Sequence, residues 1–331
     1  KRFDIMKHRN TKGVIAMIII TGATGHLGNN FARLLSSLGI EQTLLVRQIT
    51  PALEGIQATI LMGDIFDSQW IRAILHEGDT FVHFAAFIDL SNQSWEECLR
   101  VNDIQTRVLF DLCKELHVRF IFLSSVDAFG RHPKDKHVSI PSMIVPDEKR
   151  GSYAYSKARA SQRLMEMMQR QEIQGAIIFP TAVIGPHDYK PSRAGKEMIH
   201  VSKHRILFSI RGGYNFIDVR DVAKCTWEIV KNQMEGYFLL GNQEVTIRAL
   251  YREIMDVKQH RSLVIGIPRW IARFFIRFVP GYTSVMIDAV TDNYHYDLSS
   301  MQSLQVEMTP FRQTIVDTLS WFEKQEKKSQ S

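Results

Sequence analysis

A glycine-rich loop between a short apolar run and a helix constrains this chain more than any other feature. The run Val14–Ile20 leads into Thr21-Gly22-Ala23-Thr24-Gly25-His26-Leu27-Gly28, and an amphipathic stretch over Asn29–Leu38 follows. Glycines at this spacing allow a tight turn, close approach of the backbone to a pyrophosphate, and tight helix–strand packing. The helix N-terminus adds free N–H donors. This context predicts a dinucleotide-binding site, and an ordinary tight turn is the alternative.

The rest of the first half alternates short apolar runs with helix-length amphipathic stretches. The apolar runs are continuous rather than alternating, as burial on both faces of a parallel sheet requires. Strands separated by helices indicate βαβ units. We therefore expect an α/β fold of the Rossmann type, a doubly wound parallel sheet, in which these segments follow the glycine loop: Gln42–Val46, Trp70–Leu75, Thr80–Phe84, Val101–Leu116 and Phe120–Leu123.

The second half is less regular. A loop over Gly130–Gly151 precedes a strong helix over Ser152–Arg170 and a buried strand at Ala176–Phe179. Glycines and prolines interrupt the pattern after Pro180, which indicates a smaller, irregular substrate lobe. The expected divisions are a disordered extension over 1–13, a nucleotide-binding domain over 14–180, a substrate-binding lobe over 181–322 and a flexible tail over 323–331.

Composition excludes several classes of protein. With 331 residues, 45% of them hydrophobic, the chain can bury a large core. No apolar run approaches the roughly 20 residues of a membrane-spanning helix. The three cysteines are widely spaced and form no metal-ligand grouping, so we expect a reduced, cytoplasmic protein without a metal. The net charge of +6 is dispersed and favours a small polyanionic ligand at least as much as nucleic acid, for which nothing else argues.

The residue after the second strand bears on the choice of dinucleotide. That residue is Arg47, where an acidic side chain would bind the ribose hydroxyls of NAD and an arginine suits the 2′-phosphate of NADP. NADP(H) is therefore expected over NAD(H), and a plain surface arginine is the alternative. After the third strand, Asp64 and Ile65 can contact the adenine, or Asp64 can simply cap its loop.

A tyrosine and a lysine at helical spacing suggest proton-transfer chemistry. Tyr153 and Lys157 are four residues apart in the expected helix and project from one face. A nearby ammonium group favours the phenolate form of a tyrosine, although a solvated helix face is the alternative. Ser124 and Ser125 end the strand at Phe120–Leu123, at the sheet edge where open α/β folds bind ligands, and a hydroxyl there can hold a reacting oxygen.

Together these residues resemble the extended short-chain dehydrogenase/reductase family, which includes nucleotide-sugar epimerases and dehydratases, dihydroflavonol reductases and 3-beta-hydroxysteroid dehydrogenases. The resemblance extends from Met17 to about Phe322. Six segments follow the order of the family's motifs: Thr21–Gly28, His83–Ala86, Val101–Asn102, Ser124–Gly130, Phe179–Pro186 and Asn215–Ala223. The last segment implies that residues 214–230 return to the nucleotide-binding domain.

The resemblance also implies roles for individual residues. Tyr153 would be the general acid/base, Lys157 would lower its pKa and bind the ribose, and Ser125 rather than Ser124 would position the reacting oxygen. Asn102 would support the site, and Asp127 would be a substrate contact. The implied cofactor contacts are Thr21, Gly22, Thr24, Gly25, His26, Leu27, Gly28, Arg47, Asp64, Ile65, Phe84, Ala85, Ala86, Tyr153, Lys157, Pro180, Thr181 and Val183.

Within the family, Arg47 resembles the dihydroflavonol-reductase and aldehyde-reductase branch. Dehydratases tend to carry an Asp-Glu pair where this chain has Val126 and Asp127, which disfavours a dehydratase. We therefore expect an NADP(H)-dependent oxidoreductase that interconverts a carbonyl and an alcohol on a small organic substrate. A nucleotide-sugar epimerase or reductase with tightly bound NAD is the first alternative, and a non-catalytic NADP-sensing regulator is the second.

Three further expectations concern the surface. Basic residues between Arg193 and Arg211 can meet a diphosphate or form a solvated face. The aromatic and basic stretch Pro268–Pro280 can line an apolar pocket or pack within the fold, which we favour, or it can lie on a membrane surface. A homodimer through the helices at Val101–Leu116 and Ser152–Arg170 is expected from the family, with Leu164, Met165, Met167 and Met168 offering apolar surface or core packing.

Overall fold

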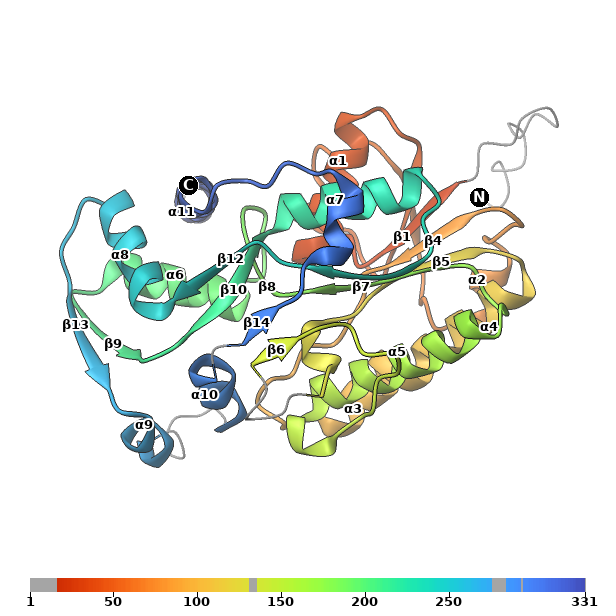
Figure 1. Ribbon diagram of the computed structural model, residues 1–331. Coiled ribbons are helices and arrows are strands. Elements are labelled where there is room, and N and C mark those ends of the chain that lie inside the picture. The colour runs from red at the N-terminus through yellow and green to blue at the C-terminus, as the bar shows by residue number, and fades with distance from the viewer. Residues whose placement is uncertain (1–16, 131–135, 276–283, 293, 331) are drawn as a thin grey trace.

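A seven-stranded parallel sheet forms the centre of the computed structural model, which describes residues 17–130, 136–275, 284–292 and 294–330 (Figure 1). The strand order is β11-β7-β5-β4-β1-β2-β3, so the direction of winding reverses between β1 and β4. This confirms the Rossmann-type α/β fold. The strands are β1 (Ile18–Thr21), β2 (Gln42–Val46), β3 (Thr59–Met62), β4 (Thr80–His83), β5 (Arg119–Leu123), β7 (Gly175–Pro180) and β11 (Gly236–Leu240).

Helices cover both faces of this sheet because alternate strand residues point to opposite sides. In β5, Phe120 and Phe122 pack into one buried cluster while Ile121 and Leu123 pack into another. The first cluster includes α4 (Thr106–Glu115) and α5 (Ser152–Gln169), with the short α2 (Ser68–Arg72) and α3 (Trp95–Leu99) nearby. The second cluster includes α1 (His26–Ser37) and α7 (Val219–Lys231), which pack against each other.

The second half adds smaller sheets around a third apolar cluster. One has three strands, β8 (Ala182–Ile184), β10 (Gly213–Asp218) and β12 (Gln243–Thr246), and two have a pair each, β9 (Ile206–Ile210) with β13 (Leu263–Ile267) and β6 (His137–Val138) with β14 (His295–Tyr296). The helices are α6 (Arg193–Lys203), α8 (Ile247–Val257), α9 (Arg269–Phe275), α10 (Ser284–Thr291) and α11 (Phe311–Gln330). Figure 1 places β9, β13 and α9 at one end of the molecule.

The structure corrects several expectations. Strand β11 completes the central sheet although 236–240 was expected in the substrate lobe. The expected flexible tail is the end of α11, held by ion pairs from Lys203 to Glu326 and from Lys258 to Glu323. The expected helix over Val101–Leu116 begins as a π-helical segment, Arg100–Gln105. Leu164, Met165 and Met167 are buried in the core rather than offered as surface. The expected extension over 1–13 lies outside the described residues.

Among the described residues, no helix is long and apolar enough to span a bilayer, and no group of three or more His, Cys, Asp or Glu side chains is arranged to bind a metal ion. Cys98, Cys113 and Cys225 are free and buried.

Candidate active site

The glycine loop is held by backbone contacts that leave no room for side chains at two positions. Gly22 has φ +77°, and a Cβ there would lie 2.6 Å from the Ala85 amide nitrogen. A Cβ on Gly28 would lie 2.5 Å from the Gly22 carbonyl oxygen. The Gly25 amide donates to that same carbonyl at 2.9 Å, and α1 begins at the next residue. The first turn of α1 carries no acidic residue, so its free N–H groups suit an anionic group such as a pyrophosphate.

His83 links the glycine loop to the neighbouring strands. Register places Thr21 of β1 beside His83 of β4, and His83 beside Phe122 of β5. The Thr21 hydroxyl shares a hydrogen bond of 2.8 Å with His83 Nδ1, and the Ala85 amide donates to the same hydroxyl at 3.3 Å. Burial, with a smaller contribution from the Lys157 charge, lowers the pKa of His83 to about 3. The imidazole is therefore neutral in the folded protein at physiological pH.

This buried histidine predicts acid sensitivity. The folded pKa lies below the unfolded value of about 6.5, so unfolded chains bind the extra proton first, and stability falls as pH drops below that value. Between about pH 6.5 and pH 5 the loss is about 2 kcal/mol from this group. Urea denaturation measures the free energy of unfolding. Over this pH range, the free energy of unfolding of the His83→Gln variant should fall less than that of the parent protein, by that amount. His117→Asn, at an exposed position, is the control. An unchanged pH dependence in His83→Gln would show that His83 is not responsible.

Ser125 and Tyr153 meet at the carboxyl end of the sheet. Ser125 follows β5 and lies at the start of the 3-10 turn Val126–Ala128, where its Oγ accepts a hydrogen bond from the Asp127 amide at 3.1 Å. Tyr153 lies in the first turn of α5, close enough to the Ser125 hydroxyl for that group to lower the Tyr153 pKa. The structure therefore brings the two hydroxyls together from segments far apart in sequence.

The pKa of Tyr153 is raised in this structure. Burial is the main cause and the Asp127 carboxylate adds to it, whereas the hydrogen bond with Ser125 lowers the pKa. The net shift is thus opposite to the lowering expected from Lys157, whose role toward Tyr153 stays a prediction. A raised pKa keeps the phenol protonated at neutral pH, which is the form that a general acid requires.

Lys157 lies one helical turn beyond Tyr153 and is completely buried from solvent. Its Nζ donates to the Leu123 carbonyl oxygen at 2.7 Å and lies 4.6 Å from the centre of the Phe122 ring. Burial lowers the pKa of Lys157 to about 7. The ammonium group therefore changes its charge within the physiological range, at the end of the strand that carries Ser125.

Ser124 has a structural contact that distinguishes it from Ser125. Its hydroxyl is buried and bonded to the Ser161 hydroxyl at 2.7 Å, which ties β5 to α5. Ser125 is only partly buried and touches Tyr153. This arrangement supports the choice of Ser125 as the residue for the reacting oxygen.

Asn102 supports the site through the backbone. Its amide group pairs with both the N–H and the C=O of Phe87, each at 2.8 Å, and donates to the Ser156 hydroxyl at 3.1 Å. The side chain lies in the π-helical segment Arg100–Gln105, a geometry often found at functional sites. Asn102 thus holds the loop after β4 against the first turns of α5, and it is a positioning residue.

Asn92 is a contributor that the sequence did not reveal. Its Oδ1 accepts from the Ser152 amide at 2.9 Å, at the N-terminus of α5. Gly151, with φ +92°, precedes the helix, and a Cβ there would lie 2.6 Å from the same Oδ1. Asn92 therefore caps the helix that carries Tyr153. Because 60 residues separate it from Ser152, no local capping pattern could have identified it.

The other predicted cofactor contacts fall into two groups. Phe84, Ala85 and Ala86 follow β4 directly beside the glycine loop, whereas Pro180, Thr181 and Val183 lie at the end of β7 and in β8. Thr181 and Val183 are engaged within the protein, through a hydrogen bond to Asn215 at 3.0 Å and through the pairing of β8 with β10. Thr24 and Leu27 lie within the loop and first turn of α1, as expected.

The side chains of Asp64 and Ile65 make contacts within the protein. Asp64 is exposed and its Oδ1 accepts from the Phe66 amide at 3.0 Å, which is the loop-capping alternative. Ile65 is buried in the apolar cluster under α4.

His26 and Asn30 fasten α1 to the second half. The His26 ring lies 3.2 and 3.1 Å from the carbonyl oxygens of Gly185 and Pro186, and the Asn30 amide donates to the Pro186 oxygen at 3.0 Å. Burial lowers the pKa of His26. The imidazole is thus directed at the loop after β8 and holds it over the glycine loop.

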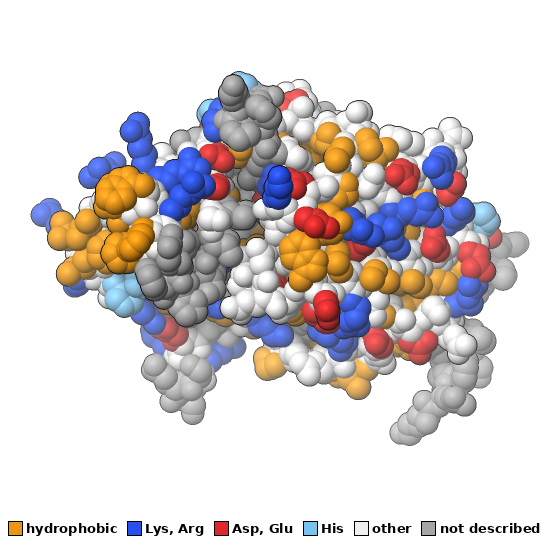
Figure 2. Space-filling view, turned by 90° about the horizontal axis from the view of Figure 1, so that it is seen from below, with side chains coloured by type: hydrophobic (Ala, Val, Ile, Leu, Met, Phe, Trp, Pro, Cys, Tyr) orange, Lys and Arg blue, Asp and Glu red, His pale blue; other side chains and the backbone are white. Residues whose placement is uncertain are grey.

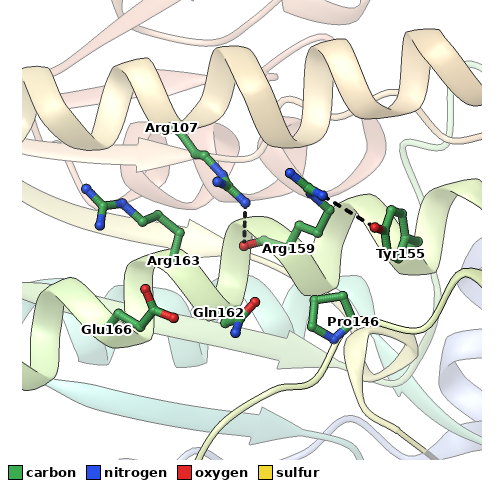
Figure 3. A pocket seen from close by; sticks show the side chains of 7 residues that line it. All are labelled: Arg107, Pro146, Tyr155, Arg159, Gln162, Arg163 and Glu166. Atoms are coloured by element: carbon green, nitrogen blue, oxygen red, sulfur yellow. Dashed lines mark hydrogen bonds between the residues drawn. The ribbon is translucent and has the colours of Figure 1, made fainter.

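A surface cavity of about 430 Å³ lies between α4 and α5, and Ser125, Tyr153 and Lys157 are not among its lining residues (Figure 3). The Arg159 guanidinium donates to the Tyr155 hydroxyl at 3.3 Å and to the buried Asp103 carboxylate at 2.5 Å. Because Tyr153 and Tyr155 are two residues apart in a helix, they point to nearly opposite sides. The lining residues are Arg107, Pro146, Tyr155, Arg159, Gln162, Arg163 and Glu166.

The fold and this pair of hydroxyls beside a glycine loop define an NAD(P)-dependent oxidoreductase. Comparison with known proteins gives the family: the chain belongs to the NAD dependent epimerase/dehydratase family, whose model matches residues 18–239. This confirms the resemblance inferred from the motifs.

Two curated relatives match almost throughout. Sterol demethylase protein B of Methylococcus capsulatus is 26% identical over 325 residues, 92% of this chain and 97% of the relative. A putative dihydroflavonol 4-reductase of Synechocystis is 24% identical over 324 residues, 92% of this chain and 94% of the relative. Among solved structures, the UDP-Glc/GlcNAc 4-epimerase of Campylobacter jejuni shares the fold, with a TM-score of 0.73, 21% identity and coverage of 94% of this chain and 100% of that one.

Proposed function

We propose that the chain catalyses NADP(H)-dependent interconversion of a ketone or aldehyde and the corresponding alcohol. The observation that carries the proposal is the contact between the Ser125 and Tyr153 side chains at the carboxyl end of β5. The glycine loop ends on the neighbouring part of the same edge, since β1 and β5 both flank β4. A substrate oxygen that reaches both hydroxyls would therefore lie close to a nucleotide on the loop.

The protein's own groups supply the proton transfer. A nicotinamide cofactor supplies or accepts the hydride when it is bound. In carbonyl reduction, Tyr153 donates its phenolic proton to the oxygen while Ser125 donates a hydrogen bond that orients it. The raised pKa of Tyr153 favours the protonated phenol that this direction requires. Lys157, whose Nζ donates to the Leu123 carbonyl oxygen, would bind the nucleotide ribose and hold a proton at its Nζ near Tyr153.

The names of the relatives favour an apolar substrate. Both a sterol demethylase protein and a dihydroflavonol reductase match more than nine-tenths of this chain. A ring-bound ketone or secondary alcohol on such a compound fits a site in which the Ser125 and Tyr153 hydroxyls lie near the Asp127 carboxylate. Candidate substrates to assay first are therefore hydrophobic cyclic ketones and their alcohols.

Arg47 supports the choice of NADP(H). It directly follows β2, is exposed, and makes no ion pair or hydrogen bond with a described residue, although its charge lowers the pKa of the nearby Glu97 carboxyl. No acidic residue occupies this position to accept the ribose hydroxyls of NAD. The guanidinium is thus available for a 2′-phosphate.

Replacing Arg47 by alanine tests this choice. We expect the Kd for NADPH to rise about 10- to 100-fold because a charge-assisted contact with the phosphate is lost. The Kd for NADH should stay within about twofold. The change in nicotinamide fluorescence on titration measures both values. Arg252→Ala, another exposed arginine, is the control. Equal losses for both nucleotides would rule out a 2′-phosphate contact.

A nucleotide-sugar epimerase with tightly bound NAD is the second candidate. The fold of a UDP-sugar 4-epimerase favours it, and so do the basic residues of α6. At least one of these, Lys203, is paired with Glu326 instead. Preferential binding of NADH over NADPH, together with interconversion of a UDP-hexose without net oxidation, would establish this candidate over the first.

A further inference from the structure

The outer face of the β9–β13 sheet is apolar and open. The register pairs Ile206 with Leu263 and Phe208 with Ile265, so these four side chains point to the same side of two parallel strands. Leu207, between them, points the other way into the third apolar cluster. Phe208 is 59% exposed and Leu263 is 62% exposed, so the described residues leave this face largely uncovered.

Helix α9 extends this apolar face. It begins two residues after β13 and contains no buried residue. Trp270 is 73% exposed, the largest aromatic side chain at this end. The two arginines of the helix, Arg269 and Arg273, point instead to Asp288 of α10, at 2.8 and 2.6 Å. In the described part of Pro268–Pro280, the helix therefore contacts α10 through its arginines and leaves its aromatic side chains exposed.

Basic residues lie next to the apolar side chains along the chain. Residues 203–214 and 257–275 contain seven Lys and Arg and no Asp or Glu. Four of the seven pair with acidic residues on α10 and α11. The other three, Arg205, Arg211 and Arg261, form no ion pair with a described residue and are all exposed. Figure 2 shows hydrophobic side chains gathered at the end formed by these elements, with Lys and Arg beside them.

We propose that the β9–β13–α9 surface, defined by Ile206, Phe208, Leu263, Ile265 and Trp270, docks on a membrane surface that carries anionic lipid headgroups. Exposed aromatic and branched side chains bury into the headgroup–acyl boundary, and a tryptophan suits this boundary because its ring is apolar and its N–H is polar. The flanking arginines face the phosphates. The inference stands independently of the proposed catalytic function.

The charge argues for lipid over a second copy of this chain. A face-to-face dimer through this surface would bring Arg205, Arg211 and Arg261 close to the same residues of the partner, and like charges at an interface are unfavourable. With an anionic lipid surface, the same three arginines would instead make favourable electrostatic interactions. Contiguous exposed apolar surface of this kind marks interaction sites in folded proteins.

Sedimentation of the full chain with vesicles tests the proposal. Vesicles of phosphatidylcholine mixed with phosphatidylglycerol should bind the protein at least tenfold more tightly than phosphatidylcholine alone. The difference should shrink as salt rises from about 50 mM to about 0.5 M, because salt screens exposed charges. The double variant Phe208→Ser, Trp270→Ser should bind at least tenfold more weakly. The control, Val145→Ser, replaces an apolar side chain that is also 73% exposed and should bind like the parent.

A second measurement guards against misfolding of the double variant. Lipids brominated in their acyl chains should quench the tryptophan fluorescence of the parent, and the conservative Trp270→Phe variant should bind equally but show less quenching. Failure of the parent to bind either vesicle would overturn the proposal. Equal binding by the double variant would do the same, as would a parent dimer in light scattering that the double variant converts to monomer.

Discussion

Replacement of Tyr153 by phenylalanine is expected to lower kcat for carbonyl reduction by about a thousandfold. The variant keeps the ring but removes the only proton that Tyr153 can donate, and general acid catalysis contributes about 10² to 10⁴ in rate. The Kd for NADPH should change by less than about twofold, since the ring still fills its place in α5. Steady-state assays and nucleotide titration of the same preparation measure the two effects separately.

Tyr155→Phe is the matched control for this variant. Tyr155 lies in the same helical turn, but its hydroxyl accepts from Arg159 at the outer cavity and not from the residues at the end of β5. Its turnover should stay near that of the parent. Activity that survives in Tyr153→Phe would refute the assigned mechanism. Intact nucleotide binding by a parent that turns over no carbonyl compound would instead favour the non-catalytic regulator.

Gly22→Ala is expected to have the second large effect. An L residue at φ +77° is strained, and its Cβ would lie 2.6 Å from one backbone atom and 2.7 Å from another, neither of which belongs to a movable side chain. Strain and overpacking together should cost about 2 to 4 kcal/mol of stability. The loop must shift to relieve the clash, so nucleotide affinity should fall by at least about a hundredfold.

The Gly39→Ala variant distinguishes the effect of backbone strain at a positive φ from the effect of a steric clash of the added Cβ. Gly39 also has a positive φ, +68°, but no heavy atom lies within 4 Å of its added Cβ. This variant should lose only about 1 kcal/mol and should bind nucleotide normally. Chemical denaturation and fluorescence titration of both variants provide the comparison. If Gly22→Ala binds NADPH like Gly39→Ala, the glycine loop does not approach a nucleotide in the way proposed.

Local patterns in the sequence predicted the central sheet well. Strand β2 has the predicted bounds, and α5 differs from its predicted range by one residue, because apolar runs and helical spacing are strong local signals. Strand β11 was missed as a member of the sheet, since its pairing with β7 is decided by tertiary position. Helix α11 extends through a polar segment that looked frayed because its partners, Lys203 and Lys258, are distant in sequence.

The sequence predicted which residues form the site, but it could not predict the pKa shifts of their side chains. The spacing of Tyr153 and Lys157 predicted a shared face. The end of β5 predicted Ser124 or Ser125, and the resemblance to the family selected Ser125. The sequence could not show that burial and Asp127 raise the pKa of Tyr153, because these depend on packing from several elements. It also could not show the contacts of Asn92 or of His83, which join segments about 60 residues apart.

The way in which the chain returns to its central sheet limits how the molecule can be divided. A fragment ending at residue 180 would keep the glycine loop, Ser125 and Tyr153, yet it would lack β11, the edge neighbour of β7, and α7, the neighbour of α1. Buried residues such as Ile20 and Leu123 share their apolar cluster with Val222 and Leu240 from those later elements. Removal of α7 and β11 would therefore leave one face and one edge of the central sheet open to water and to aggregation.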